Sequence, residues 1–367
     1  MLKVLTVVGT RPEIIRLSRI IPELDRYCDH LLVHTGQNYS SELSDVFFSE
    51  LGVRAPNEHL GVRSANFAEQ VARIIEGVDA TIARFRPDRV LILGDTNSGL
   101  SALVAARRGV PVYHLEAGNR CYDDRVPEEI NRRVIDHSSS ILMPYTDRSK
   151  ENLVREGIER ERIFVVGNPI NEVLRAFSGQ ISASSGHTRL GLKAGGYLVA
   201  TVHRAENVDV AGRLGNLVTA LHRVSEDTGL PLVVSIHPHT AQRLAEANLS
   251  SASPNVRLLD AMGFFDFVRL ERDAACVITD SGTVQEECSI LGVPNVTVRD
   301  VTERPETLEV GSNIVAGAEP DDVVAAVRLA RTMGANWTAP AEYLVARSSV
   351  AILKIVLGRL SLRRHMS

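Results

Sequence analysis

Carboxylates and guanidinium groups are crowded into residues 114–137, HLEAGNRCYDDRVPEEINRRVIDH. The segment holds six acidic residues among four arginines, namely Glu116, Asp123, Asp124, Glu128, Glu129 and Asp136 among Arg120, Arg125, Arg132 and Arg133. A solvated helix with ion pairs between neighbouring turns is one explanation. A catalytic site is the other, because clustered carboxylates raise the pKa of some members while nearby arginines keep others ionised. Similar residues can then take different proton-transfer roles.

Polar residues also follow seven short apolar runs directly along the chain. These stretches read LTVVGTRPE, LLVHTGQNY, LILGDTNSG, YHLEAGNR, ATVHRAEN, VSIHPHT and VITDSGTVQEE. In open parallel sheets, ligands bind beyond the carboxyl ends of the strands. We therefore expect these ends to line a polar cleft between two domains. The first of them is not GxGxxG, so the usual dinucleotide-binding pattern is absent.

The segment DSGTVQEE, residues 280–287, follows an apolar run and begins a predicted helix. Exposed N–H groups in its first turn, residues 281–283, and the positive end of the helix dipole would suit a diphosphate. Glu286 or Glu287, one turn further on, would accept hydrogen bonds from ribose hydroxyls. A plain serine N-cap followed by acidic residues that complement the dipole explains the segment equally well.

Histidines follow two other apolar runs. His203 and Arg204, in VHRAEN, would neutralise a leaving phosphate, although a histidine at this place is also typical of a structural role. His237 and His239, in SIHPHT, form an HxH pair that resembles part of a metal site. No third ligand has matching spacing, so we expect no metal.

The elements that would position these residues alternate between β-branched runs and helical segments. Strands are expected at residues 3–8, 30–35, 89–93, 110–115, 140–144, 163–167, 197–202, 231–236, 256–260, 276–280 and 294–298. Helical periodicity between them, as at 66–85 and 211–229, predicts a parallel α/β architecture with two doubly wound sheets.

Two domains and a returning helix are expected. The first domain would span residues 1–167 and the second 168–350, with a C-terminal helix at 351–367 that crosses back onto the first. The linker is placed at 167–169, because a short helix and then a polar, Gly/Ser-rich stretch follow it up to residue 195.

Composition excludes several classes of protein. A chain of 367 residues is too long for one ordinary core. Its net charge of −4 argues against nucleic-acid binding driven by bulk electrostatics. Neither a membrane-spanning run nor the apolar region of a signal peptide occurs, so we expect a cytoplasmic protein. The four cysteines show no CxxC or zinc-like spacing and are expected to be free thiols.

Ten motifs together resemble the non-hydrolysing UDP-N-acetylglucosamine 2-epimerase family. They are GTRPE, TGQN, GDT, HLEAG, RVPEEINR, VGNP, VHRAEN, HP, TDSGxxQEE and RDxTERPE, in this order over residues 9–306. The resemblance implies two Rossmann-like domains that face a cleft, the GT-B arrangement, with UDP held by the second domain. It also implies a UDP-sugar substrate, no cofactor, no nucleic acid or membrane partner, and a homodimer.

The resemblance also assigns roles to residues. The catalytic groups would be Asp95, Glu116, Glu128, Arg132 and His203. The substrate-binding residues would be Arg11, Arg16, His237, Ser281, Gly282, Thr283, Glu287 and Arg304. Which of the three carboxylates is the base and which the acid stays open.

The family's chemistry, inversion of C2 in a UDP-linked 2-acetamido sugar, explains these residue types. C2 is not adjacent to a carbonyl, so its hydrogen is hardly acidic. Elimination of UDP gives C1 oxocarbenium character, makes C2–H acidic and yields a 2-acetamidoglucal, to which UDP is added back. Cations must stabilise the departing UDP and carboxylates the oxocarbenium. A base and an acid are needed on opposite faces of the sugar, in a closed site.

Departures from the common pattern leave the sugar open. Arg16 replaces a lysine, Asn38 replaces a histidine after TGQ, and Thr283 replaces a glycine. UDP-N-acetylglucosamine is the first choice. The stretch from Glu116 to His137 looks more like the branch that epimerises UDP-2-acetamido-2,6-dideoxy-L-talose to UDP-N-acetyl-L-fucosamine for capsule and O-antigen. Asn38 also argues against activation by a second UDP-N-acetylglucosamine.

Three other functions remain as alternatives. A GT-B glycosyltransferase would share the fold and the UDP site, but it would not need carboxylates around C2. A hydrolysing epimerase would release the free sugar. A regulator that binds a nucleotide sugar without catalysis would have little use for the acidic residues. The products that form distinguish all three from the epimerase.

Overall fold

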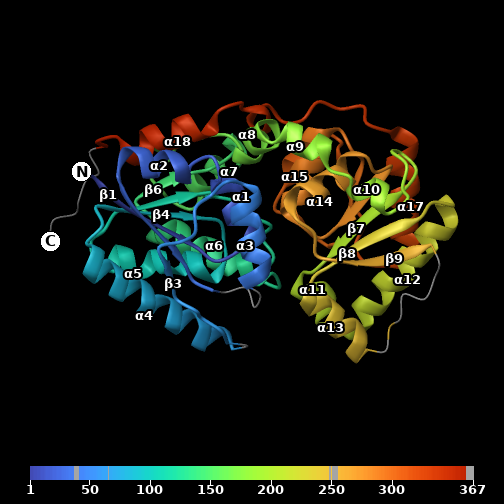
Figure 1. Ribbon diagram of the computed structural model, residues 1–367, viewed down its shortest axis with the longest axis horizontal. Coiled ribbons are helices and arrows are strands. Elements are labelled where there is room, and N and C mark those ends of the chain that lie inside the picture. Colours follow the sequence, from blue (N-terminus) through green and yellow to red (C-terminus); the bar gives the residue numbers. More distant parts are fainter. Residues whose placement is uncertain (37–40, 65, 248, 250–254, 361–367) are drawn as a thin grey trace. The chain divides into compact units, whose positions relative to one another are not determined.

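The computed structural model describes residues 1–36, 41–64, 66–247, 249 and 255–360. The chain divides into two compact units (Figure 1). The first contains Met1–Val173 and Val345–Ser367, and the second contains Leu174–Leu344. The domain limits expected from the sequence, at residues 167 and 350, stay predictions. Asn38, on which the expectation about activation depends, lies outside the described residues.

The first unit is built on a six-stranded parallel sheet in the order β3-β2-β1-β4-β5-β6. Its strands are β1 (Lys3–Val8), β2 (Asp29–His34), β3 (Glu58–His59), β4 (Arg89–Leu93), β5 (Val112–Leu115) and β6 (Ile141–Met143). Apolar and β-branched residues of the central strands are buried on both faces, which is why these runs are continuous rather than alternating. The strand order reverses between β1 and β4, where Rossmann-like sheets bind ligands.

Helices cover both faces of this sheet. They are α1 (Arg11–Leu17), α2 (Ile21–Tyr27), α3 (Ser41–Glu50), α4 (Phe67–Phe85), α5 (Ser101–Arg107), α6 (Pro127–Ser138), α7 (Asp147–Arg155) and α18 (Ser348–Leu357), with 3₁₀ turns η1 (Asn97–Leu100) and η2 (Arg160–Arg162). In Figure 1 the sheet lies between α4 and α5 on one side and α2 and α18 on the other. The apolar stripe of α4, with Ile74, Val78 and Ile82, packs on the strands and forms the core there.

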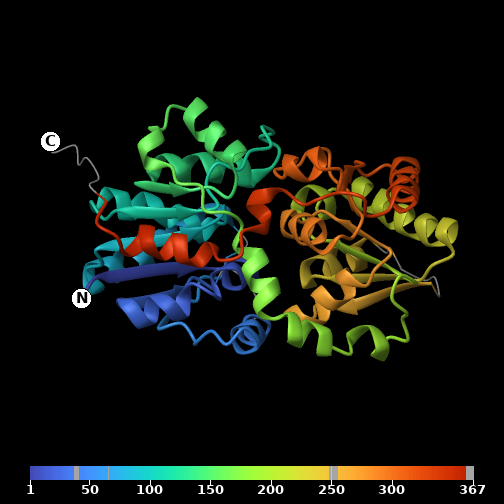
Figure 2. The same cartoon turned by 90° about the horizontal axis from the view of Figure 1, so that it is seen from above.

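The C-terminal helix α18 belongs to the first unit, and both views show it beside that unit's strands (Figure 2). Arg89, at the start of β4, donates a hydrogen bond to the carbonyl oxygen of Val356. The N–H of Ser349 donates to the Glu172 carboxylate at 2.9 Å. These two contacts tie the helix to the unit at both ends.

The second unit repeats the same topology. Its sheet has the order β12-β11-β10-β7-β8-β9, made of β7 (Leu198–Val202), β8 (Leu232–Ile236), β9 (Val256–Asp260), β10 (Cys276–Thr279), β11 (Asn295–Thr297) and β12 (Asn313–Val315). All of its pairings are parallel, and the order reverses between β7 and β10. The expected α/β architecture with two doubly wound sheets is therefore confirmed.

The helices of the second unit follow its strands. They are α9 (Ser178–Ala183), α10 (Gly186–Arg189), α11 (Ala205–Val208), α12 (Ala211–Thr228), α13 (Pro238–Glu246), α14 (Phe264–Arg272), α15 (Gly282–Leu291), α16 (Pro305–Glu309) and α17 (Pro320–Met333), with the 3₁₀ turn η3 (Ala341–Leu344). Helix α8 (Pro169–Ala176) runs across the boundary of the two units. No helix in the described part of the chain is long and apolar enough to cross a membrane.

Ten of the eleven expected strands are present, but the strand expected at 163–167 is wrong. The N–H groups of Phe164 and Val166 donate to the carbonyls of Leu142 and Pro144 along the edge of β6. Pro144 has no N–H to donate back, so the ladder cannot close and only an isolated bridge at Ile163 remains. The short strands β3 and β12 were not expected, because two or three residues are too few to show the hydrophobic pattern of a strand.

The polar, Gly/Ser-rich stretch up to residue 195 contains two short helices, α9 and α10, which pack on α14. The Ser184 hydroxyl makes the turn between them, since it accepts a hydrogen bond from the Gly186 N–H at 3.1 Å and donates one to Asp266 on α14. Ser, Thr and Asp commonly stabilise such turns through local side-chain bonds.

Candidate active site

Glu116, directly after β5, is held in a strained and buried position. Its backbone φ is +71°, in the left-handed region that non-glycine residues rarely adopt. The Arg16 guanidinium and the Tyr145 hydroxyl, at 3.2 Å, both donate to one carboxylate oxygen, and the Asn119 amide donates to the other at 3.3 Å. Strain of this kind persists where surrounding contacts enforce it, as they do at many active sites. Arg16, expected to bind substrate, is therefore the ion-pair partner of Glu116.

A buried ionic network supports the backbone just after Glu116. Asp136 of α6 accepts from the Gly118 N–H at 3.2 Å and pairs with Arg120 at 2.7 Å and with His114 at 2.8 Å. Burial alone would raise the pKa of Asp136, but the His114 bond and the charges of His114 and Arg120 lower it overall. A Cβ on Gly118 would lie 2.2 Å from a backbone oxygen, so only glycine fits here. These contacts therefore fix the conformation of the turn that carries Glu116.

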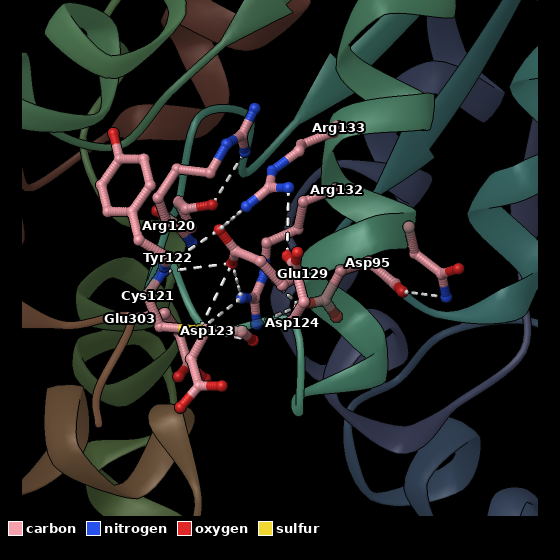
Figure 3. Close-up of polar contacts among 12 residues, drawn as sticks. Asp95, Arg120, Cys121, Tyr122, Asp123, Asp124, Glu129, Arg132, Arg133 and Glu303 are labelled. Atoms are coloured by element: carbon pink, nitrogen blue, oxygen red, sulfur yellow. Dashed lines mark hydrogen bonds and ion pairs between the residues drawn. The ribbon is translucent and has the colours of Figure 1, made fainter. Parts of the chain in front are cut away.

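A second pairing joins Asp95, after β4, to Arg132 of α6 (Figure 3). The distance is 2.7 Å, and Arg132 also pairs with Glu129 at 2.8 Å. Glu129 is fully buried and accepts further bonds from the N–H groups of Cys121 and Tyr122, each at 3.1 Å. Burial alone would raise the pKa of Glu129, but these hydrogen bonds and the Arg132 charge lower it overall. One guanidinium therefore bridges two carboxylates.

The remaining charges of the 114–137 segment divide between site and surface. Glu128 lies in the first turn of α6 and is partly exposed, whereas the adjacent Glu129 faces inward. Arg125 pairs with Asp123 at 2.6 Å, and Arg133 pairs with Asp124 at 3.1 Å and with Glu129 at 3.4 Å. The ion-pair explanation is confirmed for Asp123, Asp124 and Arg133. Glu129, expected to be part of the same solvated pairs, makes ion pairs but is fully buried.

Arg11 stands at the start of α1, beside the end of β1. Its guanidinium lies over the Phe47 ring of α3, 5.6 Å from the centroid, a cation–π arrangement. Burial lowers the pKa of Arg11. The aromatic ring thus orients a partly desolvated cation at the point where this sheet would bind a ligand.

In the second unit, buried Asp280 organises the loop that carries His203. Its carboxylate follows β10 and accepts from the backbone N–H groups of His203 and Arg204, each at 2.9 Å, and from the Asn207 amide at 3.0 Å. The His203 ring is 3.3 Å from the same carboxylate and remains 39% exposed. Asp280 therefore joins the β7 and β10 loops at the reversal of the second sheet.

Helix α15 begins directly after Ser281, and no side-chain cap occupies its N-terminus. The Ser281 hydroxyl makes no capping bond, so the plain serine N-cap explanation is wrong. Gly282 is buried, and a Cβ there would lie 2.9 Å from Glu303 and 3.4 Å from Arg304. Thr283, partly exposed, completes the turn. The Ser281 N–H donates to the Thr279 hydroxyl at 3.0 Å, and the positive end of the helix dipole has no capping bond from the Ser281 side chain.

Glu287 lies on α15 against a second carboxyl group, that of Glu271 on α14. Both side chains are buried, and the described residues supply no N–H or O–H donor to either oxygen of Glu271. Two carboxylates cannot hydrogen-bond to each other unless one carries a proton. Burial raises the pKa of Glu271 well above its ordinary value, and the Glu287 charge and hydrogen bond raise it further. The two buried carboxyl groups therefore share a proton, and the pKa of Glu271 is raised.

Replacing Glu271 with glutamine is expected to stabilise the protein above neutral pH. A carboxyl group whose pKa is raised by folding stabilises the fold fully below its unfolded pKa, and this contribution is lost as the pH rises. The wild type should lose about 1.4 kcal/mol of unfolding free energy per pH unit in that range, whereas glutamine never ionises and still donates to Glu287. Urea unfolding at pH 5 to 8 measures this, and equal pH slopes in the two proteins would contradict it.

Arg304 and His237 also lie in the second unit. Arg304 is buried and pairs with Glu286, and its backbone N–H donates to the Thr302 hydroxyl oxygen at 3.0 Å. The His237 ring accepts from the His239 N–H at 3.3 Å and caps α13. Among the described residues no group of three or more His, Cys, Asp and Glu side chains could hold a metal ion.

A family model described as UDP-N-acetylglucosamine 2-epimerase matches residues 23–357. The chain belongs to this family. One relative, the UDP-N-acetylglucosamine 2-epimerase of Methanocaldococcus jannaschii, is 39% identical over 357 residues, which covers 92% of this chain and 95% of the relative. The UDP-2,3-diacetamido-2,3-dideoxy-D-glucuronate 2-epimerase of Pseudomonas aeruginosa is 34% identical over 331 residues, 89% of this chain and 92% of the relative. As a member of this family the protein is a carbohydrate epimerase, an isomerase.

A solved structure of the same family has the same fold. The Methanocaldococcus jannaschii epimerase in complex with UDP-GlcNAc and UDP matches with a TM-score of 0.93 and 38% identity, over 97% of this chain and 99% of that one.

The sequence analysis singled out neither Glu13 nor Asp280, two buried carboxylates that lie within quoted motifs. For Asp280 the place directly after a strand was the available signal. The missed inward face of α6 was also readable, since Glu129, Arg132 and Asp136 recur at helical spacing. The assignment of Glu128 and the other carried-over residues to catalysis or binding stays a prediction.

Proposed function

We propose that this chain inverts C2 of UDP-N-acetylglucosamine to give UDP-N-acetylmannosamine, by elimination of UDP and re-addition. The pairing of two carboxylates with two guanidiniums at adjacent strand ends carries the proposal. Glu116 is paired with Arg16 after β5, and Asp95 with Arg132 after β4. Similarity to the epimerase solved with UDP-GlcNAc and UDP supports the choice of sugar.

The two pairs suit the charges that develop when UDP departs. Oxocarbenium character at C1 would be stabilised by carboxylates at these strand ends, each of which is paired with a buried guanidinium. Removal of the C2 proton and its return to the opposite face need one base and one acid. Asp95, Glu116 and Glu128 are the candidates for these two roles, and Glu116 is held by a left-handed backbone and by bonds from Arg16 and Tyr145.

The second unit supplies groups that would hold UDP. The first turn of α15, residues 281–283, would bind the diphosphate through its N–H groups and dipole. Glu287 would accept bonds from the ribose hydroxyls, with Glu271 holding its carboxylate. His203, His237 and Arg304 of this unit would complete the UDP-binding groups, with His203 directed to the diphosphate. Arg11, which lies in the first unit, is a second proposed ligand of the diphosphate.

A wider choice of sugar follows from one relative. The Pseudomonas aeruginosa enzyme named above acts, by its name, on a UDP-diacetamido-glucuronate. UDP-2-acetamido-2,6-dideoxy-L-talose, favoured by motifs near Glu116, is the second candidate substrate. Each of these sugars would undergo the same inversion at C2, so the preferred substrate is identified by comparing kcat/KM for the three.

The test is product identification by NMR with each of the three UDP-sugars, without added metal or NAD. UDP-N-acetylmannosamine formed from UDP-N-acetylglucosamine, with the highest kcat/KM of the three, is the expected result. Higher kcat/KM with the talose sugar would move the assignment to that branch. Free N-acetylmannosamine and UDP would identify a hydrolysing enzyme, and transfer of the sugar to an added acceptor would identify a glycosyltransferase. Either of these last results would refute the proposal.

We also propose that the chain works as a cytoplasmic homodimer. Light scattering on a sizing column should give a mass near twice the 40.1 kDa of one chain. A mass of one chain at micromolar concentration would contradict the dimer without affecting the epimerase assignment.

A further inference from the structure

Glu13, in the first turn of α1, is buried and makes three hydrogen bonds with two different loops. One carboxylate oxygen accepts from the N–H of Gly9 and from the N–H of Thr10, the latter at 2.8 Å. The other oxygen accepts from the Thr96 hydroxyl at 2.6 Å. Only 2% of Glu13 is exposed. The side chain therefore serves as more than the local capping box that its position, three residues after Thr10, would suggest.

These two loops meet where the first sheet reverses its strand order. Gly9 and Thr10 follow β1, and Thr96 follows Asp95 after β4. The loops touch directly, since a Cβ on Gly9 would lie 2.0 Å from the Ser98 hydroxyl oxygen. From the other side, the Asn131 amide of α6 donates to the Asp95 carbonyl at 3.0 Å. The backbone of Asp95 is thus held between Glu13 and α6.

We propose that Glu13 is a positioning residue for Asp95, and that it acts as an ionised carboxylate that ties the β1 and β4 loops together. This inference rests on the proposed function, because it gives Asp95 its importance. Glu13 itself is not assigned to substrate contact. The ionised carboxylate accepts from all three partners, so each of these bonds is charge-assisted. A protonated carboxyl group would make only weaker neutral bonds and would donate to the Thr96 hydroxyl instead of accepting from it.

Glu13 is expected to take up a proton within the pH range of ordinary enzyme assays. Burial raises the pKa of Glu13 to about 7, against the lowering effect of the Thr96, Gly9 and Thr10 hydrogen bonds, and the Asp95 charge raises it further. Asp95 is itself paired with Arg132 of α6, and Arg16 on Glu13's own helix is paired with Glu116. The hydrogen bonds through which Glu13 joins the β1 and β4 loops should therefore weaken as the pH falls below about 7.

The test compares pH profiles of kcat/KM for the wild type, Glu13→Gln and Thr96→Val. The wild type should lose activity as the pH falls through about 7. Glutamine never ionises and can contact the same three partners only through weaker neutral hydrogen bonds, so Glu13→Gln should lack this loss and be about 10-fold less active at pH 8. Thr96→Val removes a bond that lowers the Glu13 pKa, so its loss of activity should begin at higher pH.

A structural role alone would not produce this pattern. Glu151→Gln, on the exposed face of α7, is the matched control and should leave the profile unchanged. Hydrogen exchange at residues 94–98 should be faster in Glu13→Gln than in the wild type, with unchanged UDP affinity by calorimetry. A Glu13→Gln variant with wild-type pH profile and wild-type exchange would overturn the inference. If the wild type turned over no UDP-sugar, the proposed function would fail, while the exchange measurement would still test the tie.

Discussion

Glu116→Gln is expected to lower kcat by about 10³-fold while UDP binding stays unchanged. Glutamine has the shape of glutamate, so the strained turn and its partners can persist. It cannot take up a proton or stabilise positive charge at C1, and its NH2 group would face a donor, either the Asn119 amide or the Arg16 guanidinium. Turnover of UDP-N-acetylglucosamine, followed by a coupled or NMR assay, measures the loss, and calorimetry with UDP measures binding.

Tyr145→Phe is the matched control for Glu116. It removes one hydrogen bond to the same carboxylate oxygen and leaves the charge and the Arg16 pair in place. We expect a fall in kcat of about 10-fold, roughly the effect of one neutral hydrogen bond. Glu116→Gln activity within tenfold of the wild type would exclude Glu116 from the proton transfers and from charge stabilisation.

Arg132→Met is expected to cost about 3–5 kcal/mol of unfolding free energy at pH 7. The substitution leaves the fully buried Glu129 and its neighbour Asp95 without their shared guanidinium. Urea unfolding at pH 7 measures the loss. Arg125→Met, which breaks the outer pair with Asp123, is the control and should change stability little because Arg125 is largely exposed.

The same variant should also change the pH dependence of stability. Folding lowers the pKa of Glu129, so its contribution is present above its unfolded pKa, near 4.5, and is lost as the pH falls through the folded value. Without the Arg132 charge this difference shrinks, and the unfolding free energy of Arg132→Met should fall less steeply below pH 5. An Arg132→Met protein as stable as the wild type, with the same acid dependence, would show that the pair is incidental.

The sheets were predictable because buried parallel strands read as continuous β-branched runs, and ten such runs are strands here. The strand predicted at 163–167 is absent because its pairing with β6 is limited by Pro144, which directly follows β6 and has no N–H to donate. The sequence could not show which of Glu128 and Glu129 is buried, because adjacent residues lie only about 100° apart around α6. The buried direction depends on contacts with Asp95, through Arg132, and with the backbone of residues 121–122.

Residues that act across elements were out of reach of the sequence. Glu13 looks like a helix cap, and its bond to Thr96 joins residues 83 positions apart. Glu271 sits in an unremarkable helix, and only packing of α14 on α15 brings it to Glu287. The motifs at strand ends therefore identified the residues that we propose to bind the ligand. The residues that position those side chains could be identified only from the three-dimensional structure.

The origin of the hydrogen at C2 tests the central claim most directly. The protein is incubated with UDP-N-acetylglucosamine in D₂O, and the C2 position of both epimers is followed by proton NMR. Elimination and re-addition predict loss of the C2 proton signal from the product and then from the remaining substrate, with UDP and 2-acetamidoglucal accumulating on long incubation. Epimerisation with the original hydrogen retained at C2 would contradict the account.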